Sequence, residues 1–323
     1  MGEAALLLGQ LPARRVWGGE VIRSRLGAEA GEPIGELWLA YDESPVLTGA
    51  HAGSTVAEAL RVLGAAFLGR EPFDRYGLEL PLLVKLLDTS AWLSVQVHPD
   101  DAYAHDVERA SGFHGKTEAW LILEGTGELV YGVSAAVDAE TLRAAALDGT
   151  IGALLNRVSA RPGDVIYVPA GTIHALGPGL VLYEVQQRSD LTYRLYDYGR
   201  PRELHLDRAL DVSNLRPTPV PRLAEVGAGD GTVLLAAPAF LLARYAVAGR
   251  VEISAHDESF LLLTLVDGAA SWDGRALRWG ETLLVAAGGS VTLEGSALLL
   301  GSSIPSAARL ERLDPRVRVA ARP

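Results

Sequence analysis

Four polar residues of the chain, Gln96, His98, Glu118 and His174, have the types and settings of metal ligands. Gln96 and His98 are two residues apart in the run SVQVHPDD, and residues i and i+2 of a strand point to the same face. Glu118 begins an apolar run, and His174 follows the turn sequence VPAGTI. Nitrogen and oxygen ligands from separate strands, with one position left open, are typical of a catalytic zinc site. The same ligand types also suit iron, manganese, cobalt or nickel, so the identity of the metal stays open here.

Lysine is nearly absent from the chain. Of 29 basic residues only Lys85 and Lys116 are lysines. A general bias toward arginine explains the other basic residues but not why these two positions keep lysine. Arginine is a fixed planar fork, whereas lysine is a compact charge whose pKa can be tuned, so both lysines are candidate active-site residues.

The remaining histidines carry a weaker signal. A single histidine is more often a surface or core residue than a ligand, and four of them are interpreted in this way: His51, His105, His205 and His256. His114 stays ambiguous, because it lies close to Glu118 but on a glycine turn.

The elements that must position these residues are predicted to be mainly strands. Short apolar runs alternate with glycine, proline and aspartate turns, which favours a sandwich or barrel over a parallel α/β sheet. The clearest predicted strands are Pro81–Leu87, Trp92–Val97, Ala119–Leu123, Glu128–Tyr131, Asp164–Val168 and Val181–Gln186. Two segments have helical patterns, namely Ser54–Leu68 with Ser54 as the expected N-cap, and Asp138–Arg157 with an aspartate cap.

The second half of the chain repeats part of the first. The run GDVIYVPAG at Gly163–Gly171 resembles GETLLVAAG at Gly280–Gly288, at an offset of 117 residues. The run LILEGTGEL at Leu121–Leu129 resembles TLVDGAASW at Thr264–Trp272, at an offset of 143 residues. The difference falls on the helical segment at about 135–158, so the pattern predicts two similar β units, the first with a helical insertion.

The two copies differ where the first has its predicted ligands. In the second copy Leu261 stands in place of Glu118, and Val291 stands in place of His174. We therefore expect a catalytic metal-binding domain over residues 1–215 and a degenerate β domain without metal ligands over residues 216–323.

The spacings around the predicted ligands resemble those of cupins. The pattern G-x5-P-x-G-x2-H that ends at His174 resembles the second cupin metal-binding motif, and E-x6-G from Glu118 resembles the end of the first. The usual His-x-His is here Gln96-x-His98. The predicted fold class is thus mainly β, with two cupin-type β-barrels (jelly rolls) and a small helical insertion in the first.

Over most of the first 215 residues the chain resembles the type I mannose-6-phosphate isomerases of the short bacterial form. The segments that carry the resemblance are Trp17-Gly18-Gly19, Ile34–Trp38, Pro81–Asp88, Leu93–Asp101, Gly115–Trp120, Gly163–Leu176 and Tyr183–Arg200. One departure is visible after Trp38, where the family often has a histidine and this chain has Leu39-Ala40-Tyr41-Asp42.

This resemblance implies an aldose–ketose isomerase that interconverts mannose 6-phosphate and fructose 6-phosphate through a cis-enediolate. It implies one zinc per chain on His98, Glu118 and His174, with Gln96 as a fourth ligand in some members. It places the catalytic group on Arg194, Lys116 and Glu184, and the substrate-binding group on Lys85, Ser94 and Asp190. Either Lys116 or Glu184 could carry the proton, because burial and neighbouring charges can tune both pKa values.

Composition limits the setting of this activity. The net charge of −11 argues against nucleic acid as a partner, although a local basic pocket could still bind an anionic sugar phosphate. There is no cysteine, which excludes disulfides and thiolate metal sites. The sequence has no apolar stretch of about 18 residues without charge, so a membrane span is not expected. We expect a cytoplasmic protein that is a monomer or a small homo-oligomer.

Two other function classes fit the same motifs. A metal-dependent cupin dioxygenase could use the same histidine and glutamate ligands, although Gln96 and the two lysines favour an anionic substrate. A non-catalytic sugar-binding cupin is the other alternative, and the presence of Lys116, Glu184 and Arg194 argues against it.

Overall fold

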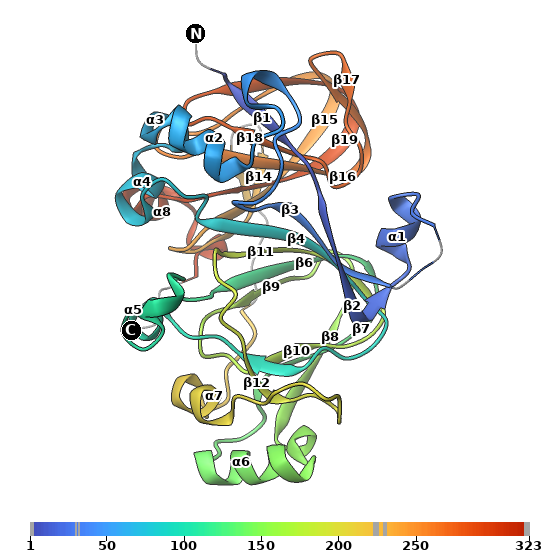
Figure 1. The fold of residues 1–323 in the computed structure, drawn as a ribbon, viewed down its shortest axis with the longest axis vertical. Coiled ribbons are helices and arrows are strands. Elements are labelled where there is room, and N and C mark those ends of the chain that lie inside the picture. Colours follow the sequence, from blue (N-terminus) through green and yellow to red (C-terminus); the bar gives the residue numbers. More distant parts are fainter. Residues whose placement is uncertain (1–2, 30, 32, 222–225, 229–230, 320–323) are drawn as a thin grey trace. The chain divides into compact units, whose positions relative to one another are not determined.

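The computed structural model describes residues 3–29, 31, 33–221, 226–228 and 231–319, and these are mainly β, as predicted. They form two compact units that alternate along the chain (Figure 1). The site unit comprises Ala13–Glu36 and Leu87–Arg222, and it carries all four predicted ligands. The companion unit comprises Met1–Pro12, Leu37–Leu86 and Leu223–Pro323. The expected domain division between residues 215 and 216 stays a prediction.

Antiparallel strands form the framework of the site unit. One sheet has the strand order β12-β5-β10-β7-β8, and in a second group β6 lies between β11 and β9. The strands are β5 (Val95–Val97), β6 (Glu118–Gly125), β7 (Gly127–Val133), β8 (Leu155–Ala160), β9 (Val165–Val168), β10 (His174–Leu176), β11 (Leu180–Gln187) and β12 (Tyr193–Tyr196). Three further strands carry residues of both units: β2 (Leu11–Gly19), β3 (Ile34–Ala40) and β4 (Leu82–Thr89).

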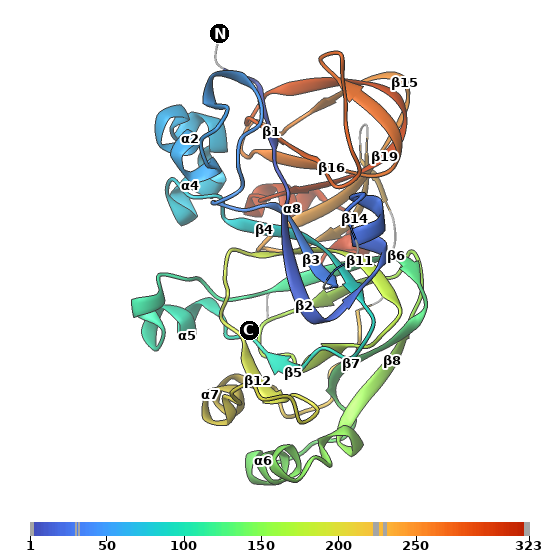
Figure 2. The ribbon, with the colours of Figure 1, turned by 45° about the vertical axis from the view of Figure 1, so that its right-hand side comes forward.

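Short helices complete the site unit. They are α1 (Val21–Arg25), α5 (Asp101–Asp106), η2 (Arg109–Ser111), α6 (Ala139–Asp148), η3 (Ile151–Ala153) and α7 (Leu206–Val212). Helices α6 and α7 lie beside β12 (Figures 1 and 2). The strands are held by a buried apolar cluster around Trp120, Ile122, Ile166 and Leu182, since alternate residues of β6, β9 and β11 point into one interior.

The companion unit is built on one sheet with the order β1-β18-β16-β19-β15-β14-β13, to which β17 adds by pairing with β16. Its strands are β1 (Ala5–Leu8), β13 (Val226–Ala228), β14 (Gly231–Ala236), β15 (Leu241–Ser254), β16 (Leu261–Trp272), β17 (Arg275–Ala276), β18 (Thr282–Val285) and β19 (Ser290–Ser303). The long strands β15, β16 and β19 dominate it (Figure 2). Its helices are η1 (Gly49–His51), α2 (Val56–Leu63), α3 (Ala65–Leu68), α4 (Arg70–Tyr76), α8 (Ala307–Arg312) and η4 (Pro315–Val317).

The mainly β, antiparallel character of the prediction is confirmed. In the described part of the chain, however, the last strand pairs with the first in none of the three strand orders, so no barrel closure is detected. Each predicted strand overlaps an observed one, and the largest difference is that β5 starts at Val95 rather than Trp92. No helix in the described ranges has both the length and the apolar character needed to cross a membrane.

Both predicted helices are shorter than expected. The segment Ser54–Leu68 is divided by Gly64, whose φ of +74° cannot continue a helix. Its N-cap is Thr55 rather than Ser54, because Thr55 and Glu58 form a reciprocal capping box. Helix α6 is capped by Asp138 as predicted but ends at Asp148, because Gly149 is in the left-handed conformation, and η3 and β8 follow.

The internal repeat is visible in the strand registers. Glu118 pairs with Val168 between β6 and β9, and Leu261 pairs with Val285 between β16 and β18, which preserves both offsets of the sequence repeat. Gln96 pairs with His174 between β5 and β10, as Ile253 pairs with Val291 between β15 and β19. These two strand pairings of the site unit therefore recur in the companion unit.

In the companion unit, apolar side chains occupy all four positions that correspond to the predicted ligands. The replacements for Gln96, His98, Glu118 and His174 are Ile253, Ala255, Leu261 and Val291, and all four are buried in one apolar cluster. In the second copy, the positions that correspond to the predicted metal ligands are thus part of an ordinary apolar core.

Candidate metal centre and active site

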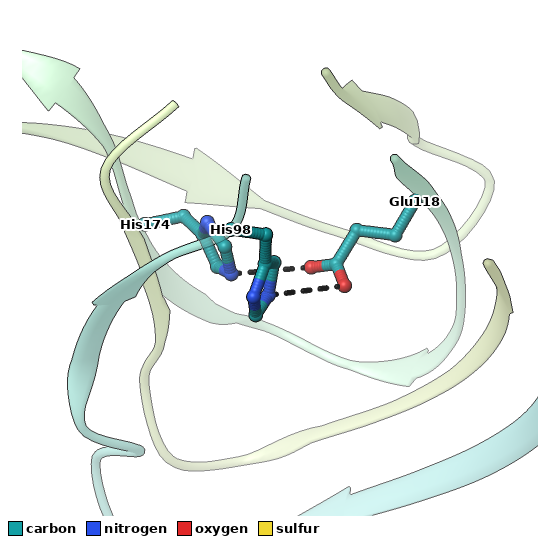
Figure 3. Close-up of side chains that lie close together, drawn as sticks. All are labelled: His98, Glu118 and His174. Atoms are coloured by element: carbon teal, nitrogen blue, oxygen red, sulfur yellow. Dashed lines mark ion pairs between the residues drawn. The ribbon is translucent and has the colours of Figure 1, made fainter. Parts of the chain in front are cut away.

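Three buried side chains converge from three segments of the site unit (Figure 3). His98 directly follows β5, Glu118 is the first residue of β6, and His174 is the first residue of β10. His174 Nε2 lies 3.2 Å from Glu118 Oε1, and His98 Nε2 lies 3.5 Å from Glu118 Oε2. Each side chain is only 1 % exposed, so the three groups face one another without bulk water.

Backbone carbonyls set the orientation of both imidazoles. The Leu191 carbonyl lies 2.8 Å from His98 Nδ1, and the Thr172 carbonyl lies 2.8 Å from His174 Nδ1. A carbonyl can only accept, so Nδ1 of each ring carries a proton. In the neutral form of each ring, Nε2 would therefore have a lone pair that faces Glu118. This is the arrangement by which metal-ligating histidines are usually held.

Two atoms of the centre have unmet bonding capacity. His98 Nε2 and Glu118 Oε2 are buried and lack a hydrogen-bond partner among the described residues. Leaving such groups unsatisfied costs about 1–3 kcal/mol each, and a divalent cation would satisfy both. Two imidazole nitrogens and one carboxylate fit a catalytic zinc site, so the residues present suit the metal that the resemblance implies.

Gln96 extends this set. Its register partner across β5 and β10 is His174, and its Nε2 lies 3.3 Å from His174 Nε2. The oxygen and nitrogen of an amide exchange places when the group turns by half a rotation, so the Gln96 carbonyl can face the same point.

The electrostatics of the centre favour ligands that are ready for a cation. Burial first, and then the charge of Lys116, lowers the pKa of His98 to about 3, so this imidazole is neutral at physiological pH. Burial by itself would raise the pKa of the Glu118 carboxyl, but Lys116 and the two histidines hold it well below its ordinary value. The Lys116 ammonium lies 3.4 Å from Glu118 Oε2.

A tightly docked loop positions Lys116. The Lys116 N–H donates to the Pro99 carbonyl at 2.9 Å. Gly115 lies so close to the start of α5 that a Cβ there would come within 2.4 Å of backbone atoms of Asp100 and Asp101. Glycine is therefore required for this approach, and the loop places Lys116 beside a predicted ligand.

A buried carboxyl group, Glu184, and a partly buried guanidinium group, Arg194, lie on the neighbouring strands. Glu184 pairs with Trp120 between β11 and β6, and the Trp120 indole N–H donates to Glu184 Oε2 at 2.9 Å. Arg194 on β12 pairs with Gln96 on β5. Its Nε is buried without a hydrogen-bond partner in the described structure, and burial followed by the charge of Arg202 lowers its pKa.

Comparison with known proteins identifies the setting of this site. Residues 10–118 match the model of the catalytic domain of type I phosphomannose isomerase. The mannose-6-phosphate isomerase of Streptococcus mutans is 33 % identical over 304 residues, which cover 88 % of this chain and 93 % of that protein. The chain belongs to the type I phosphomannose isomerase family.

Solved structures of phosphomannose isomerases share the fold. The crystal structure of the mannose 6-phosphate isomerase from Bacillus subtilis has a TM-score of 0.80 and 32 % identity, and the match covers 93 % of this chain and 99 % of that one. A zinc-bound mannose 6-phosphate isomerase structure has a TM-score of 0.75 at 20 % identity, covering 94 % of this chain and 100 % of that one.

The structure brings together most of the residues that the sequence singled out as a phosphomannose isomerase site. His98, Glu118, His174, Gln96 and Lys116 form one cluster through the distances given above. Arg194 pairs across strands with Gln96 of that cluster, and Glu184 pairs with Trp120, two residues after Glu118 on β6.

The expected substrate-binding residues are placed less uniformly. Ser94 is buried in the site unit, whereas Asp190 is exposed. Lys85 belongs to the companion unit, where its ammonium lies 5.4 Å from the centroid of the Trp38 ring. Substrate contacts of these three residues stay predictions.

The sequence did not identify the groups that orient the ligands. The carbonyls of Leu191 and Thr172 are backbone atoms, so the residue types at these positions do not indicate that they orient the histidines. Trp120 was part of a motif, but its hydrogen bond to Glu184 depends on the register of β6 and β11. Strand alternation could have predicted that Trp120 and Glu184 point to the same face of the sheet. It could not have predicted that the two residues lie opposite each other on β6 and β11.

Proposed function

We infer that the chain catalyses the reversible isomerisation of mannose 6-phosphate to fructose 6-phosphate. The observation that carries this inference is the buried centre of His98, Glu118 and His174, in which two atoms lack a hydrogen-bond partner, in a chain of the type I phosphomannose isomerase family. The finer fold assignment, two cupin-type barrels of which only the first holds a metal, is part of the same proposal. The expected cytoplasmic location and the oligomeric state, monomer or small homo-oligomer, stay predictions.

The proposed metal is zinc, one per chain, on His98, Glu118 and His174 with Gln96 as a fourth ligand. A related structure that contains zinc supports this choice, as does a ligand set of nitrogen and oxygen atoms alone. When bound, the cation would act as a Lewis acid toward the oxygens on C1 and C2 of the sugar.

The reaction moves one proton from C2 to C1 and the hydroxyl proton from O2 to O1 through a cis-enediolate, and negative charge builds on oxygen as the C2 proton leaves. Arg194 is proposed to stabilise that charge and position the substrate, because arginine stays protonated and its buried Nε is available for a hydrogen bond. Burial strengthens this interaction because the local dielectric is low.

Two residues are candidates for carrying the proton. Lys116 lies next to a proposed ligand, and Glu184 is a buried carboxyl group held by the Trp120 indole. Either group could remove the C2 proton and return it to C1, and Lys85, Ser94 and Asp190 are assigned to the sugar phosphate.

A coupled assay on mannose 6-phosphate tests the function. Activity should disappear after treatment with a chelator and return when zinc is added back. If no metal restores turnover, the proposed activity is wrong.

Proton exchange in deuterium oxide separates the two candidate bases. Lys116→Met and Glu184→Gln would each be loaded with zinc, and exchange at C2 would be followed by NMR. The variant that loses exchange identifies the proton carrier, and retained exchange removes that residue from this role. Arg200→Met is a matched control, since this arginine pairs with Asp197 and Trp92 rather than with the centre.

A further inference from the structure

A second group of potential ligands lies outside the buried centre. Asp101, His105 and His114 each offer a ligand atom, and these atoms lie within 4.8 Å of one another. Asp101 and His105 belong to α5, and His114 belongs to the loop before β6. Residues four apart on a helix lie on the same face, so Asp101 and His105 point to the same side.

The two imidazoles already direct nitrogens at each other. His105 Nε2 lies 2.9 Å from His114 Nδ1, and the ring centroids are 5.0 Å apart in an edge-to-face arrangement. Zinc binds imidazole nitrogens at about 2.0–2.1 Å, which places two tetrahedral ligands about 3.3 Å apart. A shift of a few tenths of an ångström would therefore change this pair into two ligands of one cation.

Hydrogen bonds hold the carboxylate in place. Asp101 Oδ1 accepts from the Gly115 N–H at 2.8 Å and from Gln187 Nε2 at 3.0 Å. The close approach that only Gly115 permits brings the neighbouring His114 to α5. The backbone thus assembles the three groups, and the carboxylate has the outer hydrogen bonds that metal-ligating carboxylates commonly have.

We propose that Asp101, His105 and His114 form a second divalent transition-metal site, with zinc as the expected cation. Asp101 and His105 are exposed and His114 is partly buried, so the site opens to solvent and water can complete the coordination. Its exposure makes it weaker than the buried centre, because its ligands exchange with water. A cation there would tie α5 to the loop that carries Lys116. This proposal is independent of the isomerase activity, and it revises the interpretation of His105 as an isolated surface residue.

Zinc titration of the full protein tests this site. Protein that holds one zinc per chain after dialysis would be titrated with zinc against a chromophoric competing chelator. A second, weaker equivalent is expected, and the double variant His105→Ala/His114→Ala should lose it. Asp101→Asn should weaken the second equivalent by at least about tenfold, the lower end of what losing even an outer-shell partner costs. The first zinc and the isomerase turnover should stay unchanged in the double variant.

The matched control removes two histidines of the companion unit, His51→Ala/His256→Ala, and should keep the second equivalent. The proposal fails if the wild-type protein binds one zinc only, if the second equivalent survives in His105→Ala/His114→Ala, or if the control loses it as well. Histidine-selective 15N NMR gives a readout on the unaltered protein. The second equivalent should shift the His105 and His114 resonances, and shifts confined to other histidines would overturn the assignment.

Discussion

The hydrogen bond from Trp120 to Glu184 can be removed without emptying the core. The substitution Trp120→Phe keeps an aromatic ring in the buried cluster and deletes the indole N–H, which donates to Glu184 Oε2 at 2.9 Å. A hydrogen bond to a charged group contributes about 1.5–3 kcal/mol, and Glu184 is almost fully buried, so little water can replace the lost donor. We expect the free energy of unfolding to fall by about 2 kcal/mol beyond the effect of the smaller ring.

Trp17→Phe measures that ring effect. Trp17 packs in the same buried cluster, and its indole makes no side-chain hydrogen bond in the described structure. Denaturant unfolding of the two variants at pH 7 therefore isolates the hydrogen bond as the difference between them.

The kinetic consequence concerns the orientation of the Glu184 carboxylate. If this carboxylate acts on the substrate, a displacement of about 1 Å costs on the order of 100-fold, so kcat should fall about 10- to 100-fold while KM changes little. Equal destabilisation by Trp120→Phe and Trp17→Phe, together with an unchanged kcat, would refute the role assigned to this hydrogen bond.

Three further predictions concern the metal centre and its loop. Loss of a group that only hydrogen-bonds a metal ligand weakens metal binding by about 10- to 100-fold, so Glu118→Gln should weaken zinc binding by more than this. Competition with a chelator measures the affinity, and an unchanged value would remove Glu118 from the ligand set. Gly115→Ala should lower the free energy of unfolding by about 1–3 kcal/mol and reduce turnover, because the new Cβ overlaps the backbone of Asp100 and Asp101. A fully active, equally stable variant would contradict the close approach of this loop to α5. In metal-free protein, His98 has a pKa of about 3 when folded and an ordinary value near 6.5 when unfolded. The contribution of neutral His98 to the free energy of unfolding is therefore complete above pH 6.5 and is lost as the pH falls toward 3. The loss of stability is at most about 5 kcal/mol. His98→Gln should flatten this part of the stability profile, and an equally steep profile in that variant would show that other groups cause it.

The sequence predicted the convergence of His98, Glu118 and His174 because its signals are local. Strand alternation placed Gln96 and His98 on one side, and the glycine and proline spacing before His174 indicated the turn that directs it. The repeat also predicted that Leu261 and Val291 replace two of the ligands, and the strand registers of the companion unit agree with this.

Other features depend on contacts that a single sequence does not encode visibly. The second cluster was missed because Asp101 and His105 lie on a short helix while His114 is brought to them by a loop that only Gly115 allows to dock. The break at Gly64 was missed because apolar spacing continues through it, and only its positive φ ends the helix. Patterns in sequence predicted the elements, whereas the hydrogen bonds between elements had to come from the structure.

The paired strand frameworks also bear on how the protein would respond to metal loss. A cation that binds only the folded site unit stabilises that unit by mass action, by about 4 kcal/mol at a free metal concentration 1,000 times Kd. The companion unit has Ile253, Ala255, Leu261 and Val291 at the matching places, and its packing owes nothing to a cation. Depletion of metal should therefore lower the protection against hydrogen exchange most around His98, Glu118 and His174, and least at the apolar cluster of the companion unit. The apolar copy therefore provides a reference within the same molecule, with which the effect of the metal on the stability of the site unit can be compared.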